Sequence, residues 1–177
     1  MIDYESLITD IPDYPKPGVI FKDITTLLSD GEGFAAAVHD IAEHFRDAGI
    51  TKVVGAEARG FVVGAPVAVE LGAGFVPVRK PGKLPRETIK QEYELEYGTD
   101  TLEIHKDALG PDDVVLIADD LIATGGTAIA SIQLAQQSGA RVAGVAFLLE
   151  LTPFKSRERL AEVTDAEFYS LVQVDEY

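Results

Sequence analysis

One stretch of the sequence constrains what this chain can fold into more than any other. Residues 114–118 read Val-Val-Leu-Ile-Ala, and an unbroken apolar run of this kind is typical of a strand covered on both faces of a parallel sheet. Asp119 and Asp120 follow directly, and after a small polar loop a helix is expected to begin near Thr127. Because ligands of parallel sheets bind at the carboxyl ends of the strands, we expect the functional site at these two acids.

The loop after the two acids has the composition of a phosphate-binding site. Gly125 and Gly126 lack a Cβ, so their backbone can approach an anion closely. The loop also offers successive backbone N–H groups and two threonine hydroxyls at the start of a helix, where negative charge is stabilised. Its residues are Ala123, Thr124, Gly125, Gly126 and Thr127.

The two acids indicate what lies beside the phosphate. The carboxylates of Asp119 and Asp120 can accept hydrogen bonds from a vicinal diol, or they can hold a hydrated Mg²⁺ ion. A diol beside a phosphate indicates ribose 5-phosphate. The alternative is an ordinary solvated strand end followed by a turn. We prefer the ribose phosphate because strand, acids, loop and helix occur in the order that such a site needs.

The overall composition limits the classes of protein that this chain can represent. It has 177 residues, of which 46% are hydrophobic and 25% charged, as expected for one domain with a sizeable core. A net charge of −15 opposes a main role in binding nucleic acid or anionic membranes. The longest apolar run, residues 61–69, is too short to span a bilayer. The absence of cysteine and of a signal-peptide pattern favours a reduced, cytoplasmic setting.

Positive charge is concentrated in one short segment, residues 79–90. Two prolines and a glycine predict a mobile loop at its start, and Glu87 is its one acid. Such a segment can attract an anionic substrate to an otherwise acidic protein, although a basic loop that merely faces water is the alternative. Its cationic residues are Arg79, Lys80, Lys83, Arg86 and Lys90.

Strand and helix patterns alternate along the chain. This alternation predicts a single-domain α/β fold, with a parallel sheet flanked by helices on both faces. Two alternating segments around Gly98, residues 93–97 and 101–105, predict a β-hairpin. The other predicted strands are 52–56, 75–78, 114–118, 141–149 and 168–172, and the predicted helices are 34–45, 61–71 and 128–138.

Four blocks of the sequence resemble the type I phosphoribosyltransferases, and within them the enzymes that use adenine. The blocks lie near residues 15–23, 57–60, 79–98 and 119–127, in the order that the family has them. The resemblance implies that residues 1–177 form one phosphoribosyltransferase domain, in which residues 1–30 contribute to a small base-binding hood. The hairpin would be a flexible flap over the site.

The same resemblance implies an activity in purine salvage. The 5-phosphoribosyl group of 5-phosphoribosyl 1-pyrophosphate (PRPP) would be transferred to adenine, giving AMP and pyrophosphate. The reaction would depend on Mg²⁺ held mainly through PRPP and water, with no direct protein ligand. The expected partners are therefore adenine and PRPP, with no nucleic acid and no membrane, and the expected assembly is a homodimer.

The resemblance also implies a role for each matching residue. Glu96, near N7 of the base, and Arg59 would be catalytic. The ribose phosphate would bind Asp119, Asp120, Ala123, Thr124, Gly125, Gly126 and Thr127. Pyrophosphate would bind Ala58, Arg59, Arg79, Lys80 and Lys83, with Arg79 or Lys83 supplied by a second subunit and with a cis peptide bond at Glu57–Ala58. The base would lie against Val19, Ile20, Phe21 and Lys22, with Phe21 as its stacking partner.

The choice of base depends on a single position in the phosphate loop. The related hypoxanthine-guanine enzymes have an aspartate, facing N7 of the purine, where this chain has Ala123. Alanine cannot perform that task, which favours adenine. Lys22 stands where the family often has arginine, and lysine lacks the planar fork needed for bidentate contacts. Two alternatives stay open: a phosphoribosyltransferase for another base, and a non-catalytic regulator that senses PRPP or a nucleotide.

Overall fold

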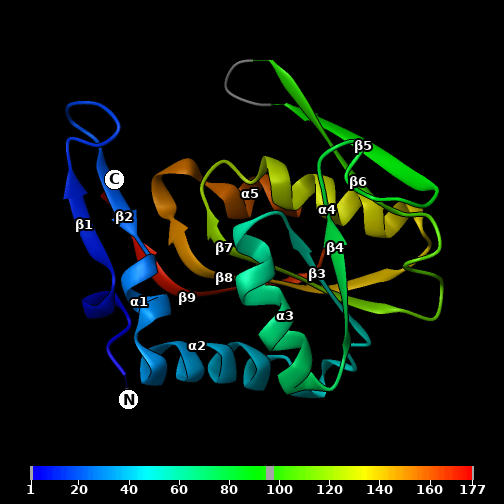
Figure 1. Ribbon diagram of the computed structural model, residues 1–177, viewed down its shortest axis with the longest axis horizontal. Helices are drawn as coiled ribbons and strands as arrows, with labels where there is room; N and C mark the ends of the chain where they lie inside the picture. The colour runs from blue at the N-terminus through cyan, green and yellow to red at the C-terminus, as the bar shows by residue number, and fades with distance from the viewer. Residues whose placement is uncertain (1, 95–97, 177) are drawn as a thin grey trace.

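A five-stranded parallel sheet forms the centre of the molecule (Figure 1). The computed structural model describes residues 2–94 and 98–176. The strand order is β4-β3-β7-β8-β9, and every neighbouring pair is parallel, which confirms the predicted α/β sheet. The strands are β3 (Lys52–Ala56), β4 (Gly74–Val78), β7 (Val114–Ile122), β8 (Arg141–Leu151) and β9 (Glu167–Val174).

Helices cover both faces of the sheet. In Figure 1, α4 (Gly126–Gln137) and α5 (Ser156–Ala161) lie above the sheet and α2 (Gly31–His44) lies below it. The helix α3 (Arg59–Leu71) packs on the same face as α2. Alternate residues of the central strand β7 belong to the two cores. Val115 and Ile117 pack with α4, whereas Leu116 and Ala118 pack with α2 and α3. This alternation is the reason for the uninterrupted apolar run in the sequence.

The central strand is longer than its apolar run indicates. Because β7 extends to Ile122, Asp119 and Asp120 lie within the strand, and the prediction that they follow it is wrong by four residues. The neighbouring strand β8 runs beside β7 as far as the pair Ile122–Glu150, so these backbone groups find partners in the sheet. The helix α4 begins at Gly126, one residue before the position expected from the sequence.

Two small antiparallel pairs of strands flank the central sheet (Figure 1). Near the N-terminus, β1 (Thr9–Pro12) pairs with β2 (Ile20–Asp23), and α1 (Thr25–Ser29) follows. The predicted hairpin is present as β5 (Thr88–Glu94) and β6 (Thr99–His105). It begins five residues earlier than predicted, because Thr88–Gln91 pair with Leu102–His105. The end of the basic segment, including Lys90, is therefore strand rather than loop.

Candidate active site

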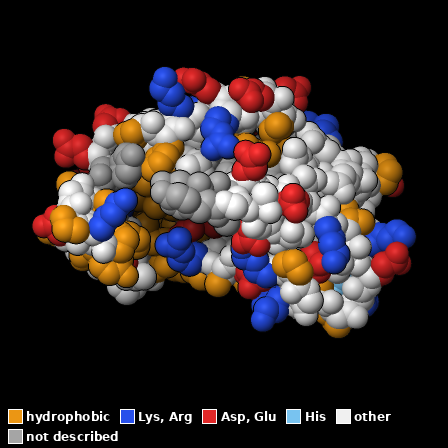
Figure 2. All heavy atoms as spheres, turned by 90° about the horizontal axis from the view of Figure 1, so that it is seen from above, with side chains coloured by type: hydrophobic (Ala, Val, Ile, Leu, Met, Phe, Trp, Pro, Cys, Tyr) orange, Lys and Arg blue, Asp and Glu red, His pale blue; other side chains and the backbone are white. Residues whose placement is uncertain are grey.

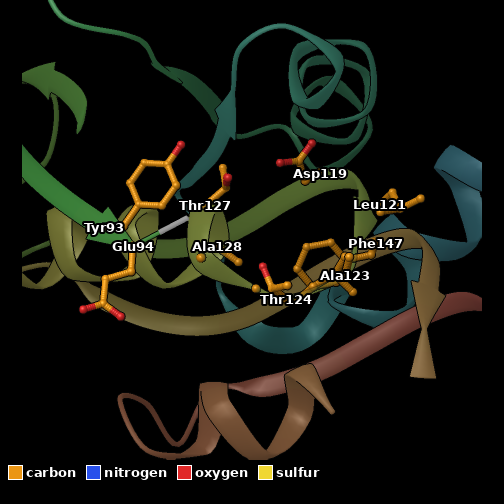
Figure 3. A pocket seen from close by; sticks show the side chains of 12 residues that line it. Tyr93, Glu94, Asp119, Leu121, Ala123, Thr124, Thr127, Ala128 and Phe147 are labelled. Atoms are coloured by element: carbon orange, nitrogen blue, oxygen red, sulfur yellow. The ribbon is translucent and has the colours of Figure 1, made fainter. Parts of the chain in front are cut away.

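The loop between β7 and α4 lines a cavity of about 190 Å³ (Figure 3). All five loop residues that the sequence singles out line this cavity, from Ala123 to Thr127. Asp119 from β7, Phe147 from β8 and Tyr93 from the hairpin also contribute. Figure 3 shows Thr127 between Tyr93 and Asp119 in this view. The structure thus brings the expected loop and one of the two acids together around one space.

The start of α4 leaves backbone donors available for an anion. Gly125, which caps the helix, has φ +83°, a left-handed conformation that favours glycine. No side chain caps this helix, and its first residues, Gly126, Thr127 and Ala128, line the cavity. A helix N-terminus of this kind, lined by small residues, is suited to a phosphate group.

The hairpin approaches the same loop closely. A Cβ on Gly126 would lie 3.1 Å from the ring of Tyr93 and 3.2 Å from the carbonyl oxygen of Glu94. Gln91 and Gln137 form a further contact between hairpin and α4, with 2.5 Å between side-chain nitrogen and oxygen. Sequence reasoning did not assign Tyr93 to the site. Its alternation with exposed neighbours in β5 indicates only that its side chain lies on the less exposed face of the hairpin.

The two acids differ in their surroundings. Asp119 lines the cavity, and its Oδ1 accepts a hydrogen bond from the backbone N–H of Asp120 at 2.8 Å. The side chain of Asp120 is 5% exposed, and its Oδ2 lies 3.1 Å from Nε of Arg59. Burial, followed by the negative charge of Asp120, raises the pKa of Asp119 well above its ordinary value, although Arg59 acts in the opposite direction. Hydrogen-bond donors or a cation placed at this pair would therefore be stabilised.

The turn before α3 lies against these acids. The peptide bond Glu57–Ala58 is cis, as the resemblance implies. A Cβ on Gly60 would lie 2.9 Å from Oδ1 of Asp119, so only a glycine lets the helix begin this close to the carboxylate. Arg59, at the first position of α3, brings its guanidinium to Asp120, and no side chain caps this helix either.

The turn also holds the beginning of the basic segment. The carboxylate of Glu57 accepts a hydrogen bond from the backbone N–H of Lys80 at 2.5 Å and lies 3.4 Å from Nε of Arg79. Lys80 reaches Asp100 and the hydroxyl of Tyr93, the latter at 3.3 Å. The structure therefore brings Ala58, Arg59, Arg79 and Lys80 to one region.

Carboxylates already face most of the basic segment. Lys90 pairs with Glu103 at 3.0 Å, and Arg86 pairs with Asp107 at 2.7 Å. Lys83 is exposed, with its backbone N–H bound to the carbonyl of Lys80. The concentration of positive charge expected from the sequence is thus offset by acids that are distant along the chain.

A second, more apolar cavity of about 570 Å³ lies between the N-terminal segment and α3. Phe21 and Tyr14 line it with their rings edge to face, 5.3 Å between centroids, and Arg59 and Val62 line it from α3. Figure 2 shows hydrophobic side chains gathered at the end of the molecule that carries β1 and β2, with Lys and Arg side chains beside them. Arg59 connects the two regions, because it lines this cavity and pairs with Asp120.

The other residues expected at the base are placed differently from Phe21. Lys22 forms an ion pair with Asp10 at 2.8 Å. The carbonyl oxygen of Val19 accepts a hydrogen bond from the N–H of Tyr14 at 3.3 Å, and Ile20 begins β2. Glu96, the expected catalytic acid, lies outside the described residues.

Comparisons with known proteins agree with this geometry. A family model described as "Phosphoribosyl transferase domain" matches residues 25–175. An adenine phosphoribosyltransferase from Aeromonas salmonicida is 56% identical over 156 residues, which are 88% of this chain and 86% of that protein. The chain belongs to the adenine phosphoribosyltransferase family.

Solved structures of adenine phosphoribosyltransferases have the same fold over nearly the whole chain. The enzyme from Thermoanaerobacter pseudethanolicus is 47% identical with a TM-score of 0.90, over 97% of this chain and 98% of that one. The Giardia lamblia enzyme, solved in complex with 9-deazaadenine, is 40% identical with a TM-score of 0.90, over 98% and 97% of the two chains. The expected type I phosphoribosyltransferase fold is thereby confirmed.

Two negative findings concern the described part of this phosphoribosyltransferase. None of the described helices combines the length and the hydrophobicity needed to cross a membrane. Within residues 2–94 and 98–176, no group of three or more His, Cys, Asp or Glu side chains is arranged to hold a metal ion.

Proposed function

We propose that this chain transfers the 5-phosphoribosyl group of PRPP to adenine, giving AMP and pyrophosphate in purine salvage. The observation that carries the proposal is the loop from Ala123 to Thr127, which lines a cavity together with Asp119 at the carboxyl end of the central strand. Membership of the adenine phosphoribosyltransferase family supports the identity of the base.

In this mechanism the β7–α4 loop holds the ribose phosphate still. The N–H groups at the start of α4 and the hydroxyls of Thr124 and Thr127 receive the 5-phosphate, because no side chain among the described residues caps this helix. Asp119 and Asp120 receive the two ribose hydroxyls. Each such hydrogen bond to a charged carboxylate contributes about 1.5–3 kcal/mol, and a fixed sugar lowers the entropic part of the barrier.

The chemical step separates charge, and the basic residues manage that charge. Breaking the bond between C1 of the ribose and pyrophosphate leaves positive charge on the sugar and negative charge on the leaving group. Arg59, Arg79, Lys80 and Lys83, with the backbone of Ala58, stabilise the departing pyrophosphate. Arg59 and Arg79 must exchange their pairing with Asp120 and Glu57, at 3.1 and 3.4 Å, for contacts with the substrate.

The acid pair also fits a magnesium ion held mainly by the substrate. Asp120 Oδ2 is buried, and its one partner among the described residues is the ion-paired Arg59, whose contact does not have hydrogen-bond geometry. The pKa of Asp119 is raised by burial and by its neighbour. Mg²⁺ prefers oxygen ligands and commonly takes one or two carboxylates together with water and substrate phosphates. When bound, the ion would neutralise charge on the pyrophosphate. Asp119 and Asp120 would hold it through water, without a direct bond to the metal.

The base binds in the hood formed by the N-terminal residues 1–30. Phe21, flanked by Val19, Ile20 and Lys22, gives adenine a stacking surface in the apolar cavity. The Giardia lamblia enzyme was solved in complex with 9-deazaadenine, which supports the identity of the base. Glu96 stabilises N7 as the base reacts, and closure of the hairpin as a flap keeps water from the cationic sugar.

We further propose that residues 1–177 act as one domain within a homodimer in the cytoplasm. Val69 of α3 leaves 80% of its surface exposed and is available for contact with a second copy. The resemblance implies that either Arg79 or Lys83 serves the neighbouring subunit, and Lys83 is exposed.

An assay that compares three bases as substrates tests this function. Adenine, hypoxanthine and guanine are each incubated with PRPP and Mg²⁺, and nucleotide formation is followed by absorbance, with EDTA as a control for the metal. We expect AMP formation with adenine and loss of activity in EDTA. Turnover with hypoxanthine or guanine but not adenine would assign a different base. Binding of PRPP without turnover of any base would assign a regulator.

A further inference from the structure

A short helix outside the cavity contacts the backbone of the phosphate loop. The guanidinium of Arg159, on α5, donates a hydrogen bond to the carbonyl oxygen of Thr124. The neighbouring Leu160 packs on the next residue of the loop, since a Cβ on Gly125 would lie 2.9 Å from its Cδ1. The residues that line the cavity include none from α5. These contacts therefore act on the loop from behind, away from the ligand.

The helix that carries Arg159 is itself fastened to the sheet. Arg157 donates two hydrogen bonds to the carboxylate of Glu150 on β8, from Nε at 2.8 Å and from Nη2 at 2.7 Å. Its Nη2 also donates to the hydroxyl of Ser170 on β9 at 3.0 Å. Glu150 is 3% exposed, so this is a partly buried and bidentate pair of the stronger kind. A helix of six residues is thereby held rigidly enough to position a side chain.

The contact with Thr124 matters because of the geometry of a phosphate loop. The N–H groups of such a loop can point at an anion only if its carbonyl oxygens point elsewhere. Thr124 lies after the end of β7, so its carbonyl has no place in the sheet ladder and would otherwise be free to turn toward the anion. A carbonyl turned toward the cavity would repel a phosphate.

We propose that Arg159 is a positioning residue for the ribose phosphate: by holding the carbonyl of Thr124 it keeps the loop 123–127 in its anion-binding conformation. The inference rests on the proposed function of that loop. Arg159 touches the substrate at no point; it acts through the backbone of the loop, and its charge adds a smaller, long-range attraction.

Three variants test this role. Arg159→Met removes both the donor and the charge, and Arg159→Lys keeps the charge and one donor. Arg141→Met is the matched control, because it removes the same charge from an exposed arginine at the start of β8. Arg141 lies at the amino end of its strand, whereas the site lies at the carboxyl ends of the strands, so this substitution does not alter the site.

Steady-state kinetics give the first reading. Arg159→Met is expected to raise KM for PRPP about tenfold, as for the loss of one charge-assisted hydrogen bond, with kcat and KM for adenine changed less than about twofold. Arg159→Lys should recover most of this loss, and Arg141→Met should resemble the parent chain. An unchanged KM for PRPP in Arg159→Met, or an equal rise in Arg141→Met, would overturn the proposal.

Salt separates positioning from simple charge. Long-range attraction is screened over about 10 Å at 0.1 M ionic strength and about 3 Å at 1 M. A positioning role predicts that the ratio of KM values between Arg159→Met and the parent persists between about 0.05 and 1 M KCl. Disappearance of the ratio at high salt would reject positioning.

Direct binding keeps this inference separate from the proposed function. Ribose 5-phosphate and, as a probe without phosphate, ribose are titrated calorimetrically into the parent and Arg159→Met, after thermal unfolding has shown both to be folded. If Arg159→Met binds ribose 5-phosphate more weakly than the parent but binds ribose equally, the role of Arg159 is supported even if the parent proves inactive with adenine. Equal affinity in the two proteins refutes it even if the parent is an active transferase.

Discussion

Replacing Asp120 by asparagine should make the protein more stable and less active at the same time. The side chain of Asp120 is 5% exposed, and its nearest cation is Arg59, which is 58% exposed, at 3.1 Å. Its negative charge is the second cause, after burial, of the raised pKa of Asp119. Asparagine has nearly the same shape but carries no charge. The substitution therefore isolates the electrostatic role of this residue.

The effect on binding follows from the lost hydrogen bond to a charged acceptor. Such a bond contributes about 1.5–3 kcal/mol, so Asp120→Asn should raise KM for PRPP about 10- to 100-fold. Adenine does not meet this carboxylate in the proposed mechanism, so KM for adenine should change little.

The effect on stability follows from proton linkage at Asp119. A carboxyl group whose pKa is raised on folding stabilises the folded state below the unfolded pKa, and this stability is lost as the pH rises through the folded value. The negative charge of Asp120 therefore makes the ionised form of Asp119 unfavourable in the folded protein. Removing one charge relieves a repulsion of roughly 2–4 kcal/mol, and the lost pair with the exposed Arg59 offsets about 0–1 kcal/mol. The less favourable burial of an unpaired amide offsets more.

We expect a net gain of about 1 kcal/mol at pH 7, equivalent to a rise of roughly 2–4 °C in Tm for a chain of this size. The difference should shrink as the pH is lowered and Asp119 takes up a proton, because the repulsion between the two carboxylates is then lost in the parent as well. Thermal unfolding between pH 4 and 8, together with PRPP kinetics, measures both effects. Asp112→Asn, which removes an exposed acid in the turn before β7, is the control. A lower Tm for Asp120→Asn at pH 7, or an unchanged KM for PRPP, would refute the reasoning.

Three further substitutions test other parts of the site. Gly126→Ala should leave Tm within a few degrees but raise KM for PRPP, because the new Cβ meets the ring of Tyr93 at 3.1 Å and pushes the hairpin from the loop; normal PRPP kinetics would contradict this. Phe21→Ala should raise KM for adenine about tenfold or more with little change for PRPP, since it removes the stacking surface, and the reverse pattern would move the base elsewhere. Glu96→Gln should lower kcat more than it changes PRPP affinity; a change in affinity alone would give this residue a binding role.

Local patterns in the sequence were sufficient for the site's central part. The apolar run before Asp119, the glycines at 125 and 126 and the helix after them each reflect interactions within a few residues. Their order along the chain also puts them at the carboxyl end of a parallel strand. The hairpin was predicted from local alternation as well, whereas the cis bond at Glu57–Ala58 was predicted only from the resemblance.

Other features arose from contacts between residues far apart in the chain. No local pattern indicates that Arg159 holds the carbonyl of Thr124 or that Tyr93 packs on Gly126. Composition alone likewise suggested a strongly basic segment, whereas folding pairs Lys90 with the acid Glu103 of the next strand. Helix and strand periodicity depends on neighbouring residues, but the partner of a charge or a carbonyl depends on which elements pack together. That packing is set by burial over the whole chain, and it becomes visible only in the folded molecule.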